Sequence, residues 1–239
     1  MSKRKKRIRI TAIVVASLII GLFVGFYIYT LDYYRADEYV AEVFLSDSTN
    51  IQSLGNMTVI YPDMNRDSKV GFIFYPGGKV EATAYIPLLD KISEEGITCI
   101  LLKMPFNLAV FNVNAADKVF EEFPNIEKWF LGGHSLGGAM ASSYVGKYFE
   151  KLNGLILLGA YPINEADIPT LAVYGSEDEG LNISKLEETI NKLEIIGGNH
   201  AYFGNYGEQK GDGVAAITRE EQQEIAAEVI VDFIISNRD

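Results

Sequence analysis

A serine between two glycines is the most chemically suggestive feature of this 239-residue sequence. Gly133, Ser135 and Gly137 form the pattern G-x-S-x-G, directly after the apolar run Ile126–Leu131 and before a stretch rich in small residues. This order predicts a strand, a tight turn and a helix. Such a turn lifts the serine hydroxyl above a sheet, with glycines on either side because side chains would collide there. The pattern predicts Ser135 as a nucleophile, and an incidental serine at a glycine-rich helix start is the alternative.

A serine hydroxyl needs a base to accept its proton, and the base needs an acid to orient it. The sequence has two histidines, and only His200 lies downstream of Ser135. His200 follows the apolar run Lys192–Ile196. The preceding run, Thr170–Tyr174, is followed by Glu177, Asp178 and Glu179. The chain order serine, acid, histidine, each after a strand, is the order expected for this kind of turn. We predict His200 as the base and Asp178 as the acid, with Glu177 or Glu179 as alternatives.

Acyl transfer also needs two N–H donors for the tetrahedral oxyanion. One is expected from Leu136, directly after the serine. The other is expected from the segment 76–79, which follows the apolar run Val70–Tyr75 and reads Pro-Gly-Gly-Lys. Within it we favour Gly78, and a simple tight turn is the alternative. His134 adjoins the serine and cannot reach round to act as its base, so we expect it to pack beneath the turn.

The segments that must position these residues alternate between strand and helix patterns. Strands are expected at Met57–Tyr61, Val70–Tyr75, Ile97–Lys103, Ile126–Leu131, Gly154–Gly159, Thr170–Tyr174 and Lys192–Ile196. Helices are expected at Ala82–Glu94, Ala115–Phe123, Gly137–Tyr148, Ile183–Lys192 and Arg219–Ser236. This alternation predicts an α/β fold with a mainly parallel, doubly wound sheet covered on both faces. Ligands bind such sheets beyond the carboxyl ends of the strands, where the candidate residues are expected.

The first 31 residues predict a membrane anchor. Residues 10–31 contain no charged side chain, and as a helix these 22 residues reach roughly 33 Å, enough for a hydrocarbon core of about 30 Å. The basic run at 3–9 predicts a cytoplasmic N-terminus and an extracytoplasmic body. A cleaved signal peptide is the alternative, but the apolar stretch is long and its end offers no small-x-small cleavage site. An interfacial aromatic belt is expected from Tyr27, Tyr29, Tyr33 and Tyr34.

The remainder of the chain is strongly acidic. Six of the 21 basic residues lie within 3–9, which leaves 15 basic against 32 acidic residues, a net charge of −17. Such a body repels nucleic acid, so we expect no nucleic-acid partner. The single cysteine, Cys99, excludes an internal disulfide and a thiolate zinc site. The two histidines lie far apart in sequence, so we expect no metal.

Taken together, the motifs resemble the α/β-hydrolase superfamily, and within it the small, lidless, dienelactone-hydrolase-like group of bacterial membrane or secreted hydrolases. The resemblance runs from about Lys69 to Ile235 and is carried by Phe74-Tyr75-Pro76-Gly77-Gly78, Gly133-His134-Ser135-Leu136-Gly137-Gly138, Tyr174-Gly175-Ser176-Glu177-Asp178, Gly198-Asn199-His200-Ala201-x-Phe203-Gly204 and Tyr206-Gly207-x-Gln209-x-Gly211-Asp212. It implies an eight-stranded sheet, no cofactor and a Ser135–His200–Asp178 triad. Pro76 stands where many members have histidine. Only Tyr161 to Ile168 separate two expected strands, so no cap domain is inserted there.

These expectations converge on a serine hydrolase that cleaves a carboxylic ester, or a related acyl substrate, through an acyl-enzyme. The substrate class is a small-molecule, lipid or cell-envelope ester. An acyltransferase acting on cell-envelope acceptors would share every motif, and a catalytically silent binding protein would share the fold. Tyr202, Phe203 and Tyr206 either line the cleft or pack within their loop. The chain divides into a basic cytoplasmic tail (1–9), a transmembrane anchor (10–31), a juxtamembrane segment (32–55) and a hydrolase domain (56–239).

Overall fold

The computed structural model describes the chain apart from residues 1–2, 46–49, 63–67, 165–166 and 239. It divides into two units, Met1–Tyr33 and Tyr34–Asp239. The first unit is a single helix, α1 (Lys3–Leu31). Among the described residues, Arg7–Leu31 is the one helical segment that is long and apolar enough to cross a membrane, with a mean hydropathy of 2.4. By length and composition it fits either an anchor or a signal sequence.

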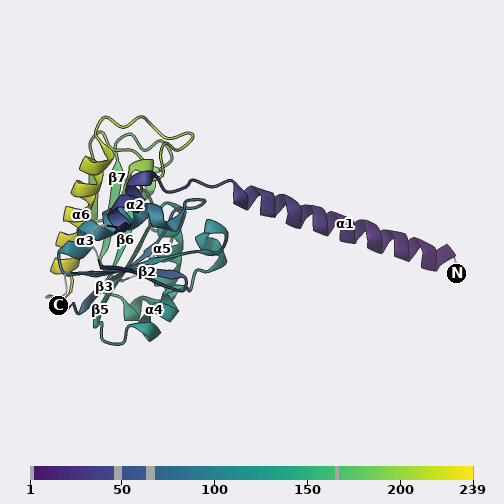
Figure 1. The fold of residues 1–239 in the computed structure, drawn as a ribbon, viewed down its shortest axis with the longest axis horizontal. Coiled ribbons are helices and arrows are strands. Elements are labelled where there is room, and N and C mark those ends of the chain that lie inside the picture. Colours follow the sequence, from purple (N-terminus) through teal and green to yellow (C-terminus); the bar gives the residue numbers. More distant parts are fainter. Residues whose placement is uncertain (1–2, 46–49, 63–67, 165–166, 239) are drawn as a thin grey trace. The chain divides into compact units, whose positions relative to one another are not determined.

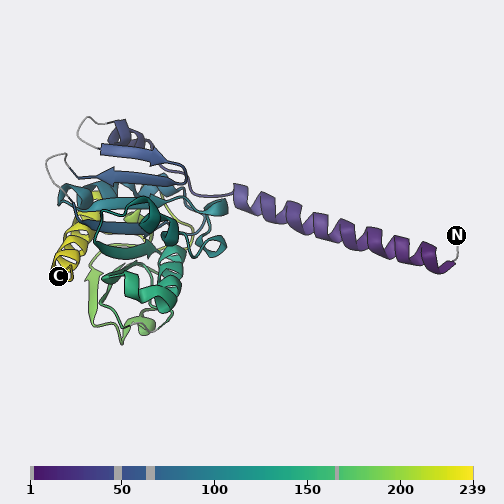
Figure 2. The same ribbon diagram turned by 90° about the horizontal axis from the view of Figure 1, so that it is seen from below.

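The second unit is built on one eight-stranded sheet, with the strand order β1-β2-β4-β3-β5-β6-β7-β8 (Figures 1 and 2). Its strands are β1 (Asn50–Leu54), β2 (Met57–Tyr61), β3 (Val70–Tyr75), β4 (Thr98–Leu102), β5 (Lys128–His134), β6 (Gly154–Leu158), β7 (Thr170–Gly175) and β8 (Asn191–Ile195). Strand β2 pairs antiparallel with both β1 and β4, and all other neighbours are parallel. The prediction of a mainly parallel α/β sheet is confirmed.

Helices cover both faces of this sheet (Figure 1). On one face lie α2 (Glu38–Leu45), α3 (Ile86–Glu94) and α6 (Arg219–Ser236), which share a single apolar cluster. On the other lie α4 (Ala116–Glu122) and α5 (Leu136–Tyr148), which share a second cluster. The connection from β6 to β7, residues 159–169, is too short to hold a cap domain.

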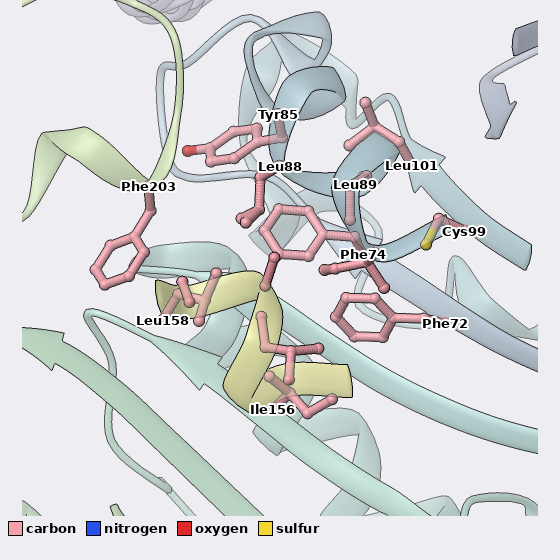
Figure 3. Packing of buried hydrophobic residues seen from close by; sticks show 14 of the residues in the cluster. Phe72, Phe74, Tyr85, Leu88, Leu89, Cys99, Leu101, Ile156, Leu158 and Phe203 are labelled. Carbon is pink, nitrogen blue, oxygen red and sulfur yellow. The ribbon is translucent and has the colours of Figure 1, made fainter. Parts of the chain in front are cut away.

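Strand β3 contributes side chains to both apolar clusters. Successive side chains of a strand point to opposite faces, so Phe72 and Phe74 enter one cluster while Ile73 and Tyr75 enter the other. Figure 3 shows the first cluster, with Phe74 packed among side chains from α3. All four of these β3 side chains are fully buried. A strand buried on both faces must be apolar at every position, which is why its bounds could be predicted from the sequence.

Two segments differ from the expected elements. The expected helix Ile183–Lys192 is wrong: the structure has only a 3-10 turn at Ile183–Leu186 before β8 begins. Leu186 is buried but Ile190 is 93% exposed, so the segment has no continuous apolar stripe to hold a helix on the sheet. Strand β1 lies in the segment 32–55 that we expected to be juxtamembrane. It is an edge strand with mostly exposed side chains, and such strands carry a weak apolar signal.

Tyr34, grouped above with the expected aromatic belt, packs instead as the first residue of the second unit. Its backbone N–H donates to Lys79 O at 2.8 Å, and its carbonyl accepts from Glu81 N–H at 2.8 Å. Its ring centroid lies 5.6 Å from that of Tyr206. The compact unit therefore starts beside the loop that follows β3.

Candidate active site

Ser135 occupies a strained turn between β5 and α5. It is the only residue between His134, which ends the strand, and Leu136, which begins the helix. Its backbone has φ 51° and ψ −121°, a left-handed conformation that non-glycine residues rarely adopt and that costs of order 1–3 kcal/mol. Its N–H donates to Leu158 O of β6 at 2.9 Å, and its side chain is partly exposed. The turn thus presents the hydroxyl at the carboxyl edge of the sheet.

The glycines on either side of this turn are required by the end of β3. A Cβ on Gly133 would lie 2.5 Å from the carbonyl oxygen of Tyr75. A Cβ on Gly137 would clash with the same oxygen and with that of Pro76. Both positions therefore exclude a side chain unless the backbone at residues 75–76 moves, which explains the glycines of the motif.

Asp178 and His200 form a buried pair at the same edge. Asp178 Oδ2 lies 2.7 Å from His200 Nδ1, and the two side chains are 0% and 6% exposed. The second carboxylate oxygen, Oδ1, accepts the N–H of Gly180 at 3.0 Å. Glu177 and Glu179 are exposed, and Glu177 accepts a hydrogen bond from Ser176 instead. Of the three acidic candidates, the structure brings Asp178 to the histidine.

Gly159, directly after β6, makes room for this pair. It has φ 51°, and a Cβ there would lie 2.9 Å from His200 Nδ1 and 3.1 Å from Asp178 Oδ2. Its neighbour Leu158 accepts the N–H of Ser135, so the serine turn and the Asp178–His200 pair meet at the end of one strand. In the described part of the chain, the Ser135 hydroxyl forms no hydrogen bond with the His200 ring.

His134 lies beneath the turn, as expected. Its side chain is buried, its ring centroid is 4.5 Å from that of His200, and its Nδ1 shares a hydrogen bond of 2.8 Å with Tyr85 Oη. Burial lowers the pKa of His134 well below its usual value, and the nearby His200 lowers it further. Burial likewise raises the pKa of Tyr85. His134 is therefore a neutral packing residue at physiological pH.

The loop after β3 approaches the start of α5. Gly77 N–H donates to Tyr85 Oη at 3.1 Å and is thereby engaged. Gly78 lies against Leu136, since a Cβ on Gly78 would be 2.8 Å from Leu136 Cδ2. The first N–H of an α-helix has no acceptor within the helix, so the Leu136 N–H is available to a ligand. The structure thus places Gly78 next to the side chain of Leu136, and their role as oxyanion donors stays a prediction.

A buried hydrogen-bond network that the sequence analysis missed holds the His200 loop. The Gln222 amide pairs with both backbone groups of Asn199, at 2.9 Å to its N–H and 2.8 Å to its carbonyl. The Asp212 carboxylate accepts from the N–H groups of His200 and Ala201, at 3.1 and 2.8 Å. One signal was present: Gln222 begins the stripe that continues through Ala226, Ile230 and Ile234, and a glutamine on a buried helix face needs a polar partner.

The aromatic residues around His200 pack within their loop. Phe203 is fully buried and Tyr206 is 5% exposed, and both belong to the apolar cluster beneath α3 and α6. Tyr202 lies under the guanidinium of Arg219, 4.8 Å from ring centroid to Cζ. Within the described residues, no three His, Cys, Asp or Glu side chains come together as a metal site would require.

Comparison with known proteins identifies a family that this chain matches. Residues 71–224 match the alpha/beta hydrolase family. No curated protein matches the chain in sequence. Similar solved structures include dienelactone hydrolase from Anabaena variabilis, which is 14% identical with a TM-score of 0.57, over 80% of this chain and 100% of that one.

Esterases are also among the similar structures. Est1E from Butyrivibrio proteoclasticus is 14% identical with a TM-score of 0.56, over 80% of this chain and 99% of that one. The esterase domain of a Rhodothermus marinus protein is 12% identical with a TM-score of 0.55, over 80% and 99%. At these identities the likeness shows the fold alone. The family match covers well over half of the chain, including Ser135 and His200 and the strands that precede them, so this chain belongs to the alpha/beta hydrolase family.

Proposed function

We propose that this chain is a serine esterase in which Ser135, His200 and Asp178 act as the catalytic triad. One observation carries the proposal: a strained, partly exposed serine turn stands at the same strand end as a buried Asp178–His200 pair, joined at 2.7 Å. Strain of this kind persists only where the surroundings enforce it, and it gathers at functional sites. The esterases and dienelactone hydrolase among the similar structures support the same reaction class.

The geometry supports an acyl-transfer cycle. Asp178 engages His200 Nδ1, which leaves Nε2 to accept a proton. Ser135 Oγ attacks the ester carbonyl carbon, its proton passes to His200 Nε2, and the N–H groups of Gly78 and Leu136 bind the oxyanion. As the C–O bond to the alcohol breaks, His200 returns the proton to the leaving oxygen. Water then repeats the sequence on the acyl-enzyme, releasing the acid and regenerating Ser135. The serine–histidine hydrogen bond is expected to form when substrate closes the site.

We further propose that α1 is an uncleaved anchor with its N-terminus in the cytoplasm and the esterase outside. The basic run at 3–9 supports this orientation through the positive-inside rule. An acyltransferase would pass through the same acyl-enzyme and differ only in the final acceptor. We favour water because Ser135 is partly exposed and the β6–β7 connection, residues 159–169, is too short to hold a domain over it.

A fluorophosphonate probe tests the proposal, because it reacts with activated serines and not with ordinary ones. The wild-type chain should be labelled at Ser135 and should hydrolyse short chromogenic esters. Ser135→Ala should abolish both signals. Ser53→Ala, which removes an exposed serine from the edge strand β1, is the matched control and should leave both unchanged. Labelling of another serine in the folded protein, or full ester hydrolysis by Ser135→Ala, would refute the assignment.

A further inference from the structure

The loop after β4 exposes a cluster of apolar side chains that the proposed reaction does not use. Phe106, Val110 and Phe111 are 49%, 45% and 50% exposed, and the two phenylalanine rings meet edge to face with centroids 5.7 Å apart. We refer to these three residues as the apolar platform. Three large apolar side chains exposed within six residues are unusual on a soluble surface and indicate a partner.

The platform is fixed to the candidate active site by backbone contacts. Phe106 and Asn107 have φ values of 56° and 54°, and Lys79, in the loop after β3, has 59°. Asn107 O accepts the N–H of Lys79 at 2.8 Å. Together with Ser135, these are the non-glycine residues of positive φ in the described chain. Such backbone conformations persist only where surrounding contacts enforce them, so the conformation of the platform loop is fixed beside Gly78.

The chain enters the compact unit at this same place. Tyr34 N–H donates to Lys79 O at 2.8 Å, so the first residue of the unit is bound to the residue that also holds the platform. Leu31, the last residue of the apolar helix, precedes Tyr34 by three positions. An extended chain of that length spans at most about 10 Å. A membrane crossed by the helix would therefore lie close to this edge of the sheet.

Charge around the platform suits a lipid surface. The body carries a net charge of −17, which repels anionic headgroups. Residues 70–80 and 103–116, which contain the loops after β3 and β4, include no acidic residue and do include Lys79 and Lys103. An acidic residue directly follows each segment, and both carboxylates are engaged: Glu81 accepts the N–H of Ala36 at 3.1 Å, and Asp117 accepts the hydroxyl of Tyr144 at 2.6 Å. The two loop segments beside the platform thus carry positive charge and no carboxylate of their own.

We propose that the apolar platform inserts into the surface of the bilayer that α1 crosses, so that the substrate is an acyl ester carried by that membrane. The occupant is the lipid interface, where phenylalanine side chains can bury while the polar loop backbone stays in the headgroup region. This inference rests on the proposed esterase and on the proposed anchor.

Tryptophan fluorescence tests the docking without relying on activity. The native Trp129 is 6% exposed, and its signal can be subtracted with the wild-type chain. The full-length chain carrying Phe111→Trp is reconstituted in phosphatidylcholine vesicles that contain brominated lipid, which quenches nearby indoles. The control is Ile190→Trp, at a position that is 93% exposed and lies at the amino end of β8, the opposite edge of the sheet.

We expect roughly threefold more quenching of the tryptophan at position 111 than of that at 190, because platform residues would lie about 5–10 Å into the interface. Equal quenching at the two positions, or none at 111, would overturn the proposal. Absence of quenching would also be the outcome if a protein partner, rather than lipid, covered the platform. The quenching result stands whether or not the chain proves to be an esterase.

Activity provides the second arm. The double variant Val110→Ser/Phe111→Ser should hydrolyse a vesicle-borne long-chain ester about tenfold more slowly, because it loses apolar burial in the interface. It should hydrolyse a water-soluble short ester within about twofold of the wild type, because the two substitutions lie outside the catalytic residues. A tenfold change would require the site to lose about 1.4 kcal/mol of transition-state stabilisation. Equal losses on both esters would make the platform part of the substrate pocket and overturn the proposal. Failure of the wild type on both esters would instead refute the proposed function.

Discussion

At the scale of single residues, Asp178 supplies the buried negative charge beside His200 in the candidate site. Its side chain is fully buried and divides its two oxygens between His200 Nδ1 and the N–H of Gly180. Asp178→Asn keeps the shape but removes the charge that fixes the histidine tautomer and stabilises its protonated form. We expect the fold to survive and turnover to fall by about 10⁴, which is the loss that the same substitution causes in a serine protease with a Ser-His-Asp triad. Steady-state kcat on a short chromogenic ester measures it.

The neighbouring carboxylates provide the control for that experiment. Glu177→Gln and Glu179→Gln change exposed side chains that do not reach His200, so both variants should keep near-normal turnover. A collapse in either variant, together with a normal rate in Asp178→Asn, would transfer the role of acid to that neighbour.

The strain at Ser135 makes a prediction about stability that is independent of substrate. Glycine adopts φ 51° and ψ −121° without steric cost, whereas alanine keeps the clash of its Cβ. Relief of strain worth about 1–3 kcal/mol outweighs the entropy that an added glycine gives the unfolded chain, about 1 kcal/mol or less. Ser135→Gly should therefore unfold at a higher urea concentration than Ser135→Ala, although both lack the nucleophile. Identical midpoints would show that the turn is not strained.

At the scale of elements, helix α6 positions the loop that carries His200. Gln222 is fully buried and pairs with both backbone groups of Asn199. Gln222→Leu would leave these two groups buried without partners, at a cost of about 1–3 kcal/mol each. We expect a clear drop in the urea midpoint and a lower kcat, because the histidine loop loses its support. Glu224 lies on the same helix α6 and forms an exposed ion pair with Lys91 of α3, so Glu224→Gln should change stability by less than about 1 kcal/mol.

Helix α3 carries a carboxylate that makes stability depend on pH. Burial, and then the nearby Glu94, raise the pKa of Asp90 to about 6 from its ordinary 3.8. The native state thus binds more protons than the unfolded state between these values, so this group makes stability fall as pH rises through that window. Asp90→Asn should be more stable than the wild type at pH 7–8 by about 1 kcal/mol, since solvent screens this partly exposed charge. The difference should vanish below about pH 4, as urea titrations at both pH values would show.

The elements also show what a sequence can and cannot predict. The segments Met57–Tyr61, Val70–Tyr75 and Arg219–Ser236 have the bounds of β2, β3 and α6, because dense burial leaves an unbroken apolar pattern. Strand β1 is half exposed at the edge of the sheet and carries no such pattern. The site divides in the same way. Chain order and strand ends pointed to Ser135, Asp178 and His200, but Gly159 and Asp212 act through contacts between distant segments that no local pattern records.

At the scale of the whole molecule, the charge asymmetry of the chain predicts its topology. Six basic residues precede the apolar helix and the rest carries a net charge of −17. Basic residues close to a span are retained in the cytoplasm, whereas acidic ones contribute little to orientation. We therefore expect residues 34–239 to lie outside the cytoplasmic membrane. Protease added to intact cells should digest this body, and a body that resists until the cells are lysed would reverse the orientation.

If α1 stays attached, the catalytic domain is held at the membrane surface; if α1 is cleaved, the domain is released. A cleaved signal would release a chain shorter by about 30 residues, a loss of roughly 3 kDa by the length of such peptides, from the 26.5 kDa of the full sequence. An anchor keeps that mass and resists extraction from membranes at alkaline pH, because a spanning helix is held by its whole apolar length. Replacing the basic residues of the run 3–9 by serine should leave the chain in the membrane but reduce the fraction with an extracytoplasmic body, since orientation and insertion depend on different residues. Recovery of the mature chain in the soluble fraction would show that the helix is a signal, and that docking through the apolar platform cannot depend on a tether at Tyr34.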